Sequence, residues 1–178
     1  MPYRREFGEW KIEFKEEFHE AFKNLFKNGE LKKSLPRNSI KFKDGIYTFK
    51  VYIDKRTWAK IRLNEVHTLH DLHNCIQGAF EFDNDHLYSF FMDGRAWSED
   101  KFTCPFEDEG PHADEVKIGE LDFSEKQSFM YLFDYGDEWR FFVEVSSIEA
   151  TNVKLMKPEI IEIKGNIPNQ YPDFDDEY

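Results

Sequence analysis

The clearest structural signal in this chain is Thr68-Leu69-His70-Asp71-Leu72-His73-Asn74-Cys75-Ile76-Gln77-Gly78-Ala79-Phe80. Inward-facing side chains recur in it at the three- and four-residue spacing of a helix that buries one face, namely Leu69, Leu72, His73, Ile76, Ala79 and Phe80. Thr68 precedes this pattern and Asp71 follows Thr68 by three positions, which nearly makes a capping box at the start of the helix. We therefore predict one core helix at about residues 68–80.

Residues 47–53 alternate in a period of two, with Tyr47, Phe49, Val51 and Ile53 on one side, as half-buried strands do. Strands are predicted at 47–53, 58–63, 86–92, 128–133, 139–147 and 160–163. The first two form a hairpin, and a tight turn at 134–137 joins the fourth strand to the fifth. Residues 98–115 are acidic, contain two prolines and are interpreted as a long loop. One helix among mostly hairpin-linked strands predicts an α+β fold with a mostly antiparallel sheet.

The first 30 residues predict a second, amphipathic helix. Large aromatic side chains fall mostly four apart along it, with charged side chains opposite, at Phe7, Trp10, Phe14, Phe18, Phe22 and Phe26. Asn28-Gly29 supplies a C-terminal stop for this helix. The Phe-rich helix is expected to pack on the main domain; the alternatives are an unknown protein partner or a second copy in a homodimer.

Charge divides the chain into two parts. Residues 1–43 carry 11 Lys/Arg and 7 Asp/Glu, whereas residues 44–178 carry 13 Lys/Arg and 29 Asp/Glu. With the helix and strand patterns, this division predicts an N-terminal amphipathic helix at 1–30, a basic linker at 31–44, an α+β domain at 45–165 and an acidic tail at 166–178.

The composition excludes several classes of protein. A net charge of −12 argues against a protein that coats nucleic acid or an anionic membrane non-specifically. Two cysteines are too few for a disulfide framework or a Cys-rich zinc module. No stretch approaches the roughly 20 apolar residues of a membrane span, and the N-terminus lacks an apolar signal core. We therefore expect a cytoplasmic protein that does not enter a membrane.

Three motifs follow one another in a characteristic order. They are the 68–80 helix, Asp85-His86-Leu87-Tyr88-Ser89-Phe90, and Tyr131-Leu132-Phe133-Asp134-Tyr135-Gly136-Asp137-Glu138-Trp139. Together they resemble the plasmid pRiA4b ORF-3-like family over about residues 45–165, with 165–172 as a trailing match. The resemblance implies an α+β fold and an association with plasmids and insertion elements. It brings no settled activity and no catalytic residues.

Histidine and aspartate side chains are the candidates for chemistry. His73 lies on the inner face of the predicted helix, His86 begins the next strand, and Asp134 and Asp137 flank the tight turn. Two imidazoles and two carboxylates suit zinc, manganese or iron, so a divalent metal is the cofactor considered, although none is established. The competing interpretation is structural: an inward histidine is hydrogen-bonded in the core, and the aspartates bond turn amides.

The same side chains define a candidate cleft between the helix, the turn and the acidic loop. Exposed tryptophans near that loop would mark it as a binding groove, because aromatic anchors are common in such sites. The candidate cleft residues are His73, His86, Trp97, Asp134, Asp137 and Trp139.

Basic residues of the predicted linker are the candidates for nucleic-acid contact. They are Lys32, Lys33, Arg37, Lys41 and Lys43, with Phe42 among them. A linker that neutralises its own acidic domain is the favoured alternative, so nucleic acid is not the expected partner.

Three functions from different classes remain open. The leading hypothesis is a non-enzymatic binding or interaction module, because neither a phosphate-binding loop nor a dinucleotide fingerprint can be read in the sequence. The second is a metal-dependent hydrolase or nuclease that uses the His/Asp site. The third is a DNA-associated accessory protein that acts through residues 32–43.

Overall fold

The structure is a computed structural model that describes residues 26–27, 30–31 and 43–171 of the 178-residue chain. Its first two elements, β1 (Phe26–Lys27) and β2 (Glu30–Leu31), pair antiparallel, with Phe26 opposite Leu31. The prediction that the N-terminal helix continues through Phe26 is therefore wrong. Asn-Gly stands between the two strands in the sequence, and this dipeptide favours a two-residue hairpin as well as a helix stop. The rest of the predicted helix, residues 1–25, lies outside the described residues.

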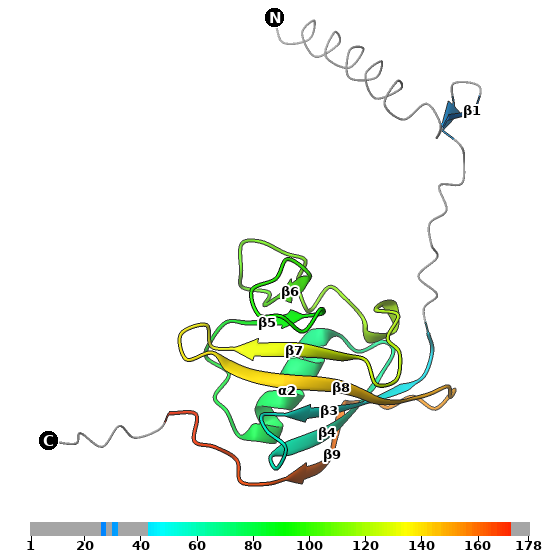
Figure 1. The fold of residues 1–178 in the computed structure, drawn as a ribbon. Coiled ribbons are helices and arrows are strands. Elements are labelled where there is room, and N and C mark those ends of the chain that lie inside the picture. The colour runs from blue at the N-terminus through cyan, green and yellow to red at the C-terminus, as the bar shows by residue number, and fades with distance from the viewer. Residues whose placement is uncertain (1–25, 28–29, 32–42, 172–178) are drawn as a thin grey trace, which may run out of the picture. The chain divides into compact units, whose positions relative to one another are not determined.

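A seven-stranded antiparallel sheet dominates residues 43–171 (Figure 1). Its strands are β3 (Ile46–Tyr52), β4 (Trp58–Asn64), β5 (Tyr88–Phe91), β6 (Lys101–Thr103), β7 (Ser128–Phe133), β8 (Trp139–Glu149) and β9 (Glu159–Lys164). They lie in the order β6-β5-β7-β8-β3-β4-β9, and all neighbours are antiparallel. The predicted α+β class and the predicted β3–β4 hairpin are confirmed.

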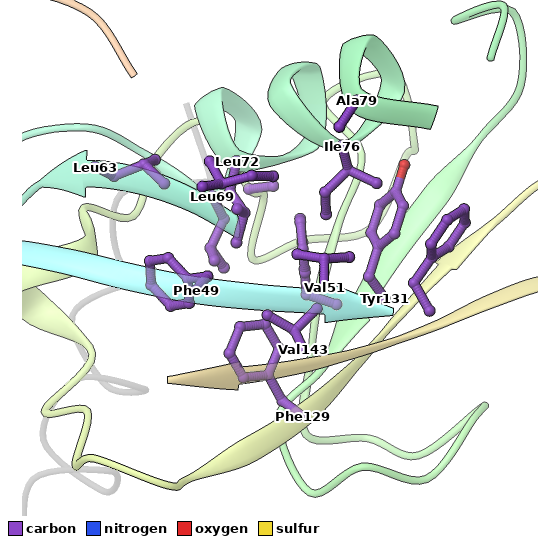
Figure 2. Packing of buried hydrophobic residues seen from close by; sticks show 14 of the residues in the cluster. Phe49, Val51, Leu63, Leu69, Leu72, Ile76, Ala79, Phe129, Tyr131 and Val143 are labelled. Atoms are coloured by element: carbon purple, nitrogen blue, oxygen red, sulfur yellow. The ribbon is translucent and has the colours of Figure 1, made fainter. Parts of the chain in front are cut away.

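Helix α2 (Leu69–Phe80) covers one face of this sheet. It begins with a complete capping box: the Asp71 amide donates to Thr68 Oγ1 at 3.1 Å, and the Thr68 amide donates to Asp71 Oδ2 at 2.8 Å. Its buried side chains point onto those of β3, β7 and β8, as Figure 2 shows for Ile76 above Val51 and Tyr131. The core helix predicted from the sequence is confirmed.

The acidic segment 98–115 is only partly a loop. Within it, β6 pairs with β5, Phe102 lying opposite Phe90, and so extends the sheet by one edge strand. Three residues are too few to show an alternating pattern, which is why this strand was not predicted. The short 3-10 helix η2 (Ile118–Glu120) follows before β7. None of the helices in the described part of the chain combines the length and the apolar character needed to cross a bilayer.

Gly165 ends β9 at a place where a side chain does not fit. Its φ is +93°, and an added Cβ would lie 2.6 Å from both the Arg56 carbonyl oxygen and Thr57 Cα. We expect Gly165→Ala to lower the free energy of unfolding by about 2 kcal/mol, measured by urea titration. Gly94→Ala is the matched control, since Gly94 has a φ of +73° with no atom within 4 Å of an added Cβ. Gly94→Ala therefore measures only the cost of placing an alanine at positive φ, about 1 kcal/mol of the free energy of unfolding. Equal losses of this free energy in the two variants would contradict the predicted clash at Gly165.

Candidate functional site

A cleft of about 490 Å³ opens beside α2, where the chain enters β5; we call it the α2–β5 cleft. Its volume falls within the roughly 300–1,000 Å³ of sites that hold small ligands. It is lined by His70, His73, Asn84, Asp85, His86, Leu87, Tyr88, Cys104 and Phe106.

Stacked rings form one wall of the α2–β5 cleft. The His73 ring lies on the Tyr88 ring with centroids 3.7 Å apart and an interplanar angle of 10°. The His70 ring stacks on His73 at 5.4 Å, and its Nδ1 lies 2.6 Å from the Tyr88 hydroxyl. His70 and His73 are three positions apart on α2, so their side chains are neighbours on the helix surface. The wall is therefore rigid, flat and aromatic.

His73 is held by a chain of hydrogen bonds that runs outward from the core. Gln77 Nε2 donates to the Tyr131 hydroxyl at 2.7 Å, and that hydroxyl lies 2.7 Å from His73 Nδ1. His73 Nε2 lies 2.8 Å from Asn84 Oδ1. Because Asn84 Oδ1 only accepts, His73 carries its proton on Nε2, and Tyr131 donates to Nδ1. Both imidazole nitrogens are thus engaged.

Burial decides the protonation state of His73. It lowers the pKa of the imidazole to about 3, against the opposing effect of the hydrogen bond to Asn84, and the electrostatic effect of the neighbouring His70 lowers the pKa further. Burial also raises the pKa of the Tyr131 hydroxyl well above its ordinary value. Both groups are therefore neutral near pH 7. Each donor in the chain of hydrogen bonds then points outward, from Gln77 through Tyr131 and His73 to Asn84.

His86 and Asp134 meet at the rim of the α2–β5 cleft. His86 Nε2 lies 3.5 Å from Asp134 Oδ2 and 3.5 Å from Asp85 Oδ1. The other carboxylate oxygen of Asp134 accepts the Gly136 amide at 2.9 Å, the usual bond of an aspartate in a turn. The Tyr171 hydroxyl donates to Asp85 at 2.8 Å and lowers the pKa of that carboxyl. The rim is thus negatively charged.

The four predicted metal ligands are not gathered at one point. His86 contacts Asp134, but both ring nitrogens of His73 are already hydrogen-bonded, one to Tyr131 and the other to Asn84. Asp137 is exposed on the turn, where its amide donates to Asp134 at 3.4 Å. Within residues 43–171, no group of three or more His, Cys, Asp or Glu side chains is placed to hold a metal ion. The predicted four-ligand set is therefore not assembled.

The two tryptophans assigned to the candidate cleft lie elsewhere. Trp139 packs edge-on against Phe82 in the core, with ring centroids 4.8 Å apart. Trp97 is 52% exposed, packs edge-on against Tyr135 at 5.0 Å and donates its indole N–H to Glu138 at 3.1 Å. Neither lines the α2–β5 cleft, whereas the sequence analysis assigned both to a cleft between the helix, the turn and the acidic loop. Trp139 lies two positions before the buried Phe141 on β8, so the two side chains share one face of the sheet. This alternation already indicated from the sequence that Trp139 faces the core.

Several cleft residues were not predicted from the sequence. His70 could have been found, since it lies three positions before His73 on the same helix. Asn84, Cys104 and Phe106 carry no local signal, because they come from loops that only the folded chain brings to α2. Of the predicted nucleic-acid contacts, Lys32, Lys33, Arg37 and Lys41 lie outside the described residues. Lys43 forms an ion pair with Asp122.

Comparison with known proteins concerns the fold and the family. No curated protein sequence matches the chain. A crystal structure of a protein of unknown function from Methanosarcina mazei Go1 is similar, with a TM-score of 0.53 and 22% sequence identity, over 68% of this chain and 70% of that chain. This likeness concerns the fold alone.

The family match spans the site. The model of the plasmid pRiA4b ORF-3-like protein family matches residues 46–171, which include the whole seven-stranded sheet, α2 and all residues that line the α2–β5 cleft. By this match, the chain belongs to the plasmid pRiA4b ORF-3-like protein family.

Proposed function

We propose that this protein is a non-enzymatic binding module, associated with mobile genetic elements, whose α2–β5 cleft binds a short basic peptide segment of a partner protein. The observation that carries the proposal is a formed cleft with a rigid aromatic wall and an apolar side chain, Phe106, 86% exposed at its edge. The family description, which refers to a plasmid reading frame, supports the association with mobile elements.

Two buried side chains of the cleft, His73 and Cys104, serve the structure rather than proton transfer. His73 is neutral near pH 7 and bonded through both nitrogens. Cys104 is 1% exposed, and its sulfur accepts the Phe106 amide at 3.3 Å. A general base or nucleophile needs a free lone pair directed at the substrate, and neither residue offers one. Binding without turnover is the function that fits this arrangement.

The charge around the cleft selects a basic ligand. Residues 83–115 contain ten Asp/Glu and two Lys/Arg. Asp85 and Asp134 place carboxylates at the rim, whereas Leu87 and Phe106 present apolar surface beside them. A peptide with a large apolar anchor between lysines fits both the apolar and the acidic surface. The anchor packs on Phe106 and His70, two rings of the cleft that are not buried, and the ammonium groups face the carboxylates.

The test uses two fluorescein-labelled hexapeptides and fluorescence anisotropy. We expect Lys-Lys-Leu-Phe-Lys-Lys to bind the full chain and Glu-Glu-Leu-Phe-Glu-Glu not to bind. Phe106→Ala should raise the Kd by about tenfold or more, because it removes the apolar edge of the cleft.

Met156→Ala is the matched control. Met156 is 97% exposed and lies outside the cleft, so its truncation removes an equally accessible apolar side chain elsewhere. Its Kd should equal that of the unmodified chain. Failure of the basic peptide to bind, or binding that Phe106→Ala leaves unchanged, would refute the proposal.

A further inference from the structure

The face of the sheet turned away from α2 carries a row of aromatic side chains. Residues alternate along each strand, so Tyr52, Trp58 and Phe142 project to this face while their chain neighbours Val51, Ala59, Phe141 and Val143 are buried toward α2. The three are direct cross-strand partners, since Phe142 pairs with Tyr52 and Tyr52 pairs with Trp58. They form one continuous row across β8, β3 and β4, the strands that lie in front of α2 in Figure 1.

This row is accessible as well as ordered. The rings of Tyr52 and Phe142 stack with centroids 5.7 Å apart and an interplanar angle of 24°. Phe142 is 43% exposed, which is unusual for a phenylalanine in the central part of a sheet. The cleft on the α2 side involves none of these residues. The row is therefore a second feature, separate from the α2–β5 cleft.

Lysine side chains gather around the end of the row. The ammonium groups of Lys50, Lys60 and Lys164 lie 4.6, 5.3 and 5.1 Å from the centre of the Trp58 ring. Lys164 is the cross-strand partner of Trp58, and Lys50 is the partner of Lys60. Like charges directly opposite each other destabilise a sheet, so this pairing has a cost in the free protein.

The three ammonium groups outnumber the two carboxylates beside them, Glu144 and Glu162. Glu144 on β8 is the cross-strand partner of Lys50 but forms no ion pair with it. Glu162 contacts both Lys60, at 3.0 Å, and Lys164, at 3.4 Å, so that one carboxylate serves two ammonium groups. Lys50 forms no ion pair within residues 43–171. The cluster thus keeps a local positive charge on a chain whose net charge is −12. An external anion placed beside the aromatic row would offset it.

We propose that this aromatic–lysine face (Lys50, Tyr52, Trp58, Lys60, Phe142 and Lys164) binds single-stranded nucleic acid. Bases stack on Phe142 and Tyr52, while phosphates contact the ammonium groups around Trp58. A single strand alternates flat bases with phosphates, and an aromatic row beside a lysine cluster matches both. A duplex does not fit, because its bases are already stacked on one another. This site is distinct from the predicted linker contacts at 32–43 and does not depend on the proposed peptide function.

The test is fluorescence anisotropy of the full chain with a fluorescein-labelled oligo(dT) of about 15 nucleotides, at about 20 mM salt. We expect the oligonucleotide to bind, and a duplex of the same length to bind about tenfold more weakly or less. Three phosphate contacts predict that log K falls with log salt concentration with a slope of about −2. Phe142→Ala should raise the Kd about fivefold or more, because base stacking on the ring is lost.

Two further variants make the outcomes distinguishable. Lys50→Glu reverses the charge of the unpaired lysine and should weaken oligo(dT) binding about tenfold, without touching the core. If Phe142→Ala alters the circular dichroism spectrum, the Kd of Lys50→Glu for oligo(dT) tests the proposal in its place. Phe106→Ala should leave oligo(dT) binding unchanged, and Phe142→Ala should leave binding of the basic hexapeptide unchanged. Failure of one proposal is thereby separated from failure of the other.

The proposal is overturned if oligo(dT) does not bind at low salt, or if its Kd is the same in the unmodified chain, Phe142→Ala and Lys50→Glu. It is also overturned if a neutral oligosaccharide such as cellohexaose binds and oligo(dT) does not. In that outcome the aromatic row stacks on sugar rings, and the lysines have no part in recognition.

Discussion

Acidification from pH 7 to pH 4 is expected to remove about 3 kcal/mol of the free energy of unfolding through His73 alone. Burial lowers the pKa of this imidazole from 6.5 to about 3 in the folded chain, so the unfolded chain binds the proton first as the pH falls. The contribution is complete above about pH 6.5 and is lost progressively between about pH 6.5 and pH 3. Urea titrations at several pH values measure it.

Two substitutions assign this pH dependence to His73. His73→Gln removes the titrating group, so its free energy of unfolding should vary less with pH, by about 3 kcal/mol over the same interval. His70 stacks on His73, and its electrostatic effect lowers the pKa of His73. His70→Gln should therefore reduce the loss, because it raises that pKa. Tyr88 and Tyr131, the other titratable contacts, have raised pKa values and carry no charge in this interval. The same pH dependence in the unmodified chain and in His73→Gln would contradict the assignment.

Tyr131→Phe is expected to lower the free energy of unfolding by about 3 kcal/mol, although it removes a single oxygen atom. The hydroxyl accepts from Gln77 and bonds His73 Nδ1, so its loss leaves two buried polar atoms without partners. Each such atom costs about 1–3 kcal/mol. Gln77 Oε1 is already buried with no hydrogen bond among the described residues, so the amide gains nothing by turning over. Urea titration near pH 7 gives the difference.

Tyr88→Phe is the matched control for this effect. The Tyr88 hydroxyl bonds His70 Nδ1 at 2.6 Å, and both residues line the cleft. Water can replace the hydroxyl there, so the expected loss is about 1 kcal/mol. Equal losses in Tyr88→Phe and Tyr131→Phe would show that water also reaches the inner end of the hydrogen-bond chain.

Elements whose signals are local were predicted well from the sequence. The capping box of α2 needs only Thr68 and Asp71, and both of its bonds are present. The strand predicted at 128–133 has the bounds of β7, whose residues 129–133 form a continuous buried apolar run. The strand predicted at 139–147 begins where β8 begins, and the first buried residues of β8 alternate with more exposed ones. Helix periodicity and strand alternation suffice where one face of an element is buried against one partner.

Elements and contacts defined by distant partners could not be predicted. The strand β6 exists because β5 offers it hydrogen bonds, and nothing in its own three residues specifies it. Likewise, His73 could be placed on the inner face of the helix, but its bond to Asn84 depends on how the chain turns after α2. His73 and His86 were both predicted in the cleft and do line it, since the helix and the next strand meet at that point. The aromatic–lysine face depends on register, which aligns Phe142, Tyr52 and Trp58 only once the strands are paired.

The interior position of β3 in the sheet has a consequence for the synthesis of the chain. Its two neighbours are β4, the next strand in the sequence, and β8, which pairs Tyr52 with Phe142 and Ile46 with Glu149. The hairpin β3–β4 and α2 are translated long before β8. Until β8 is made, the edge of β3 that later pairs with β8 has no partner, and the core beside it is incomplete. The domain closes only when residues 139–149 have left the ribosome, and any need for a chaperone is greatest until then.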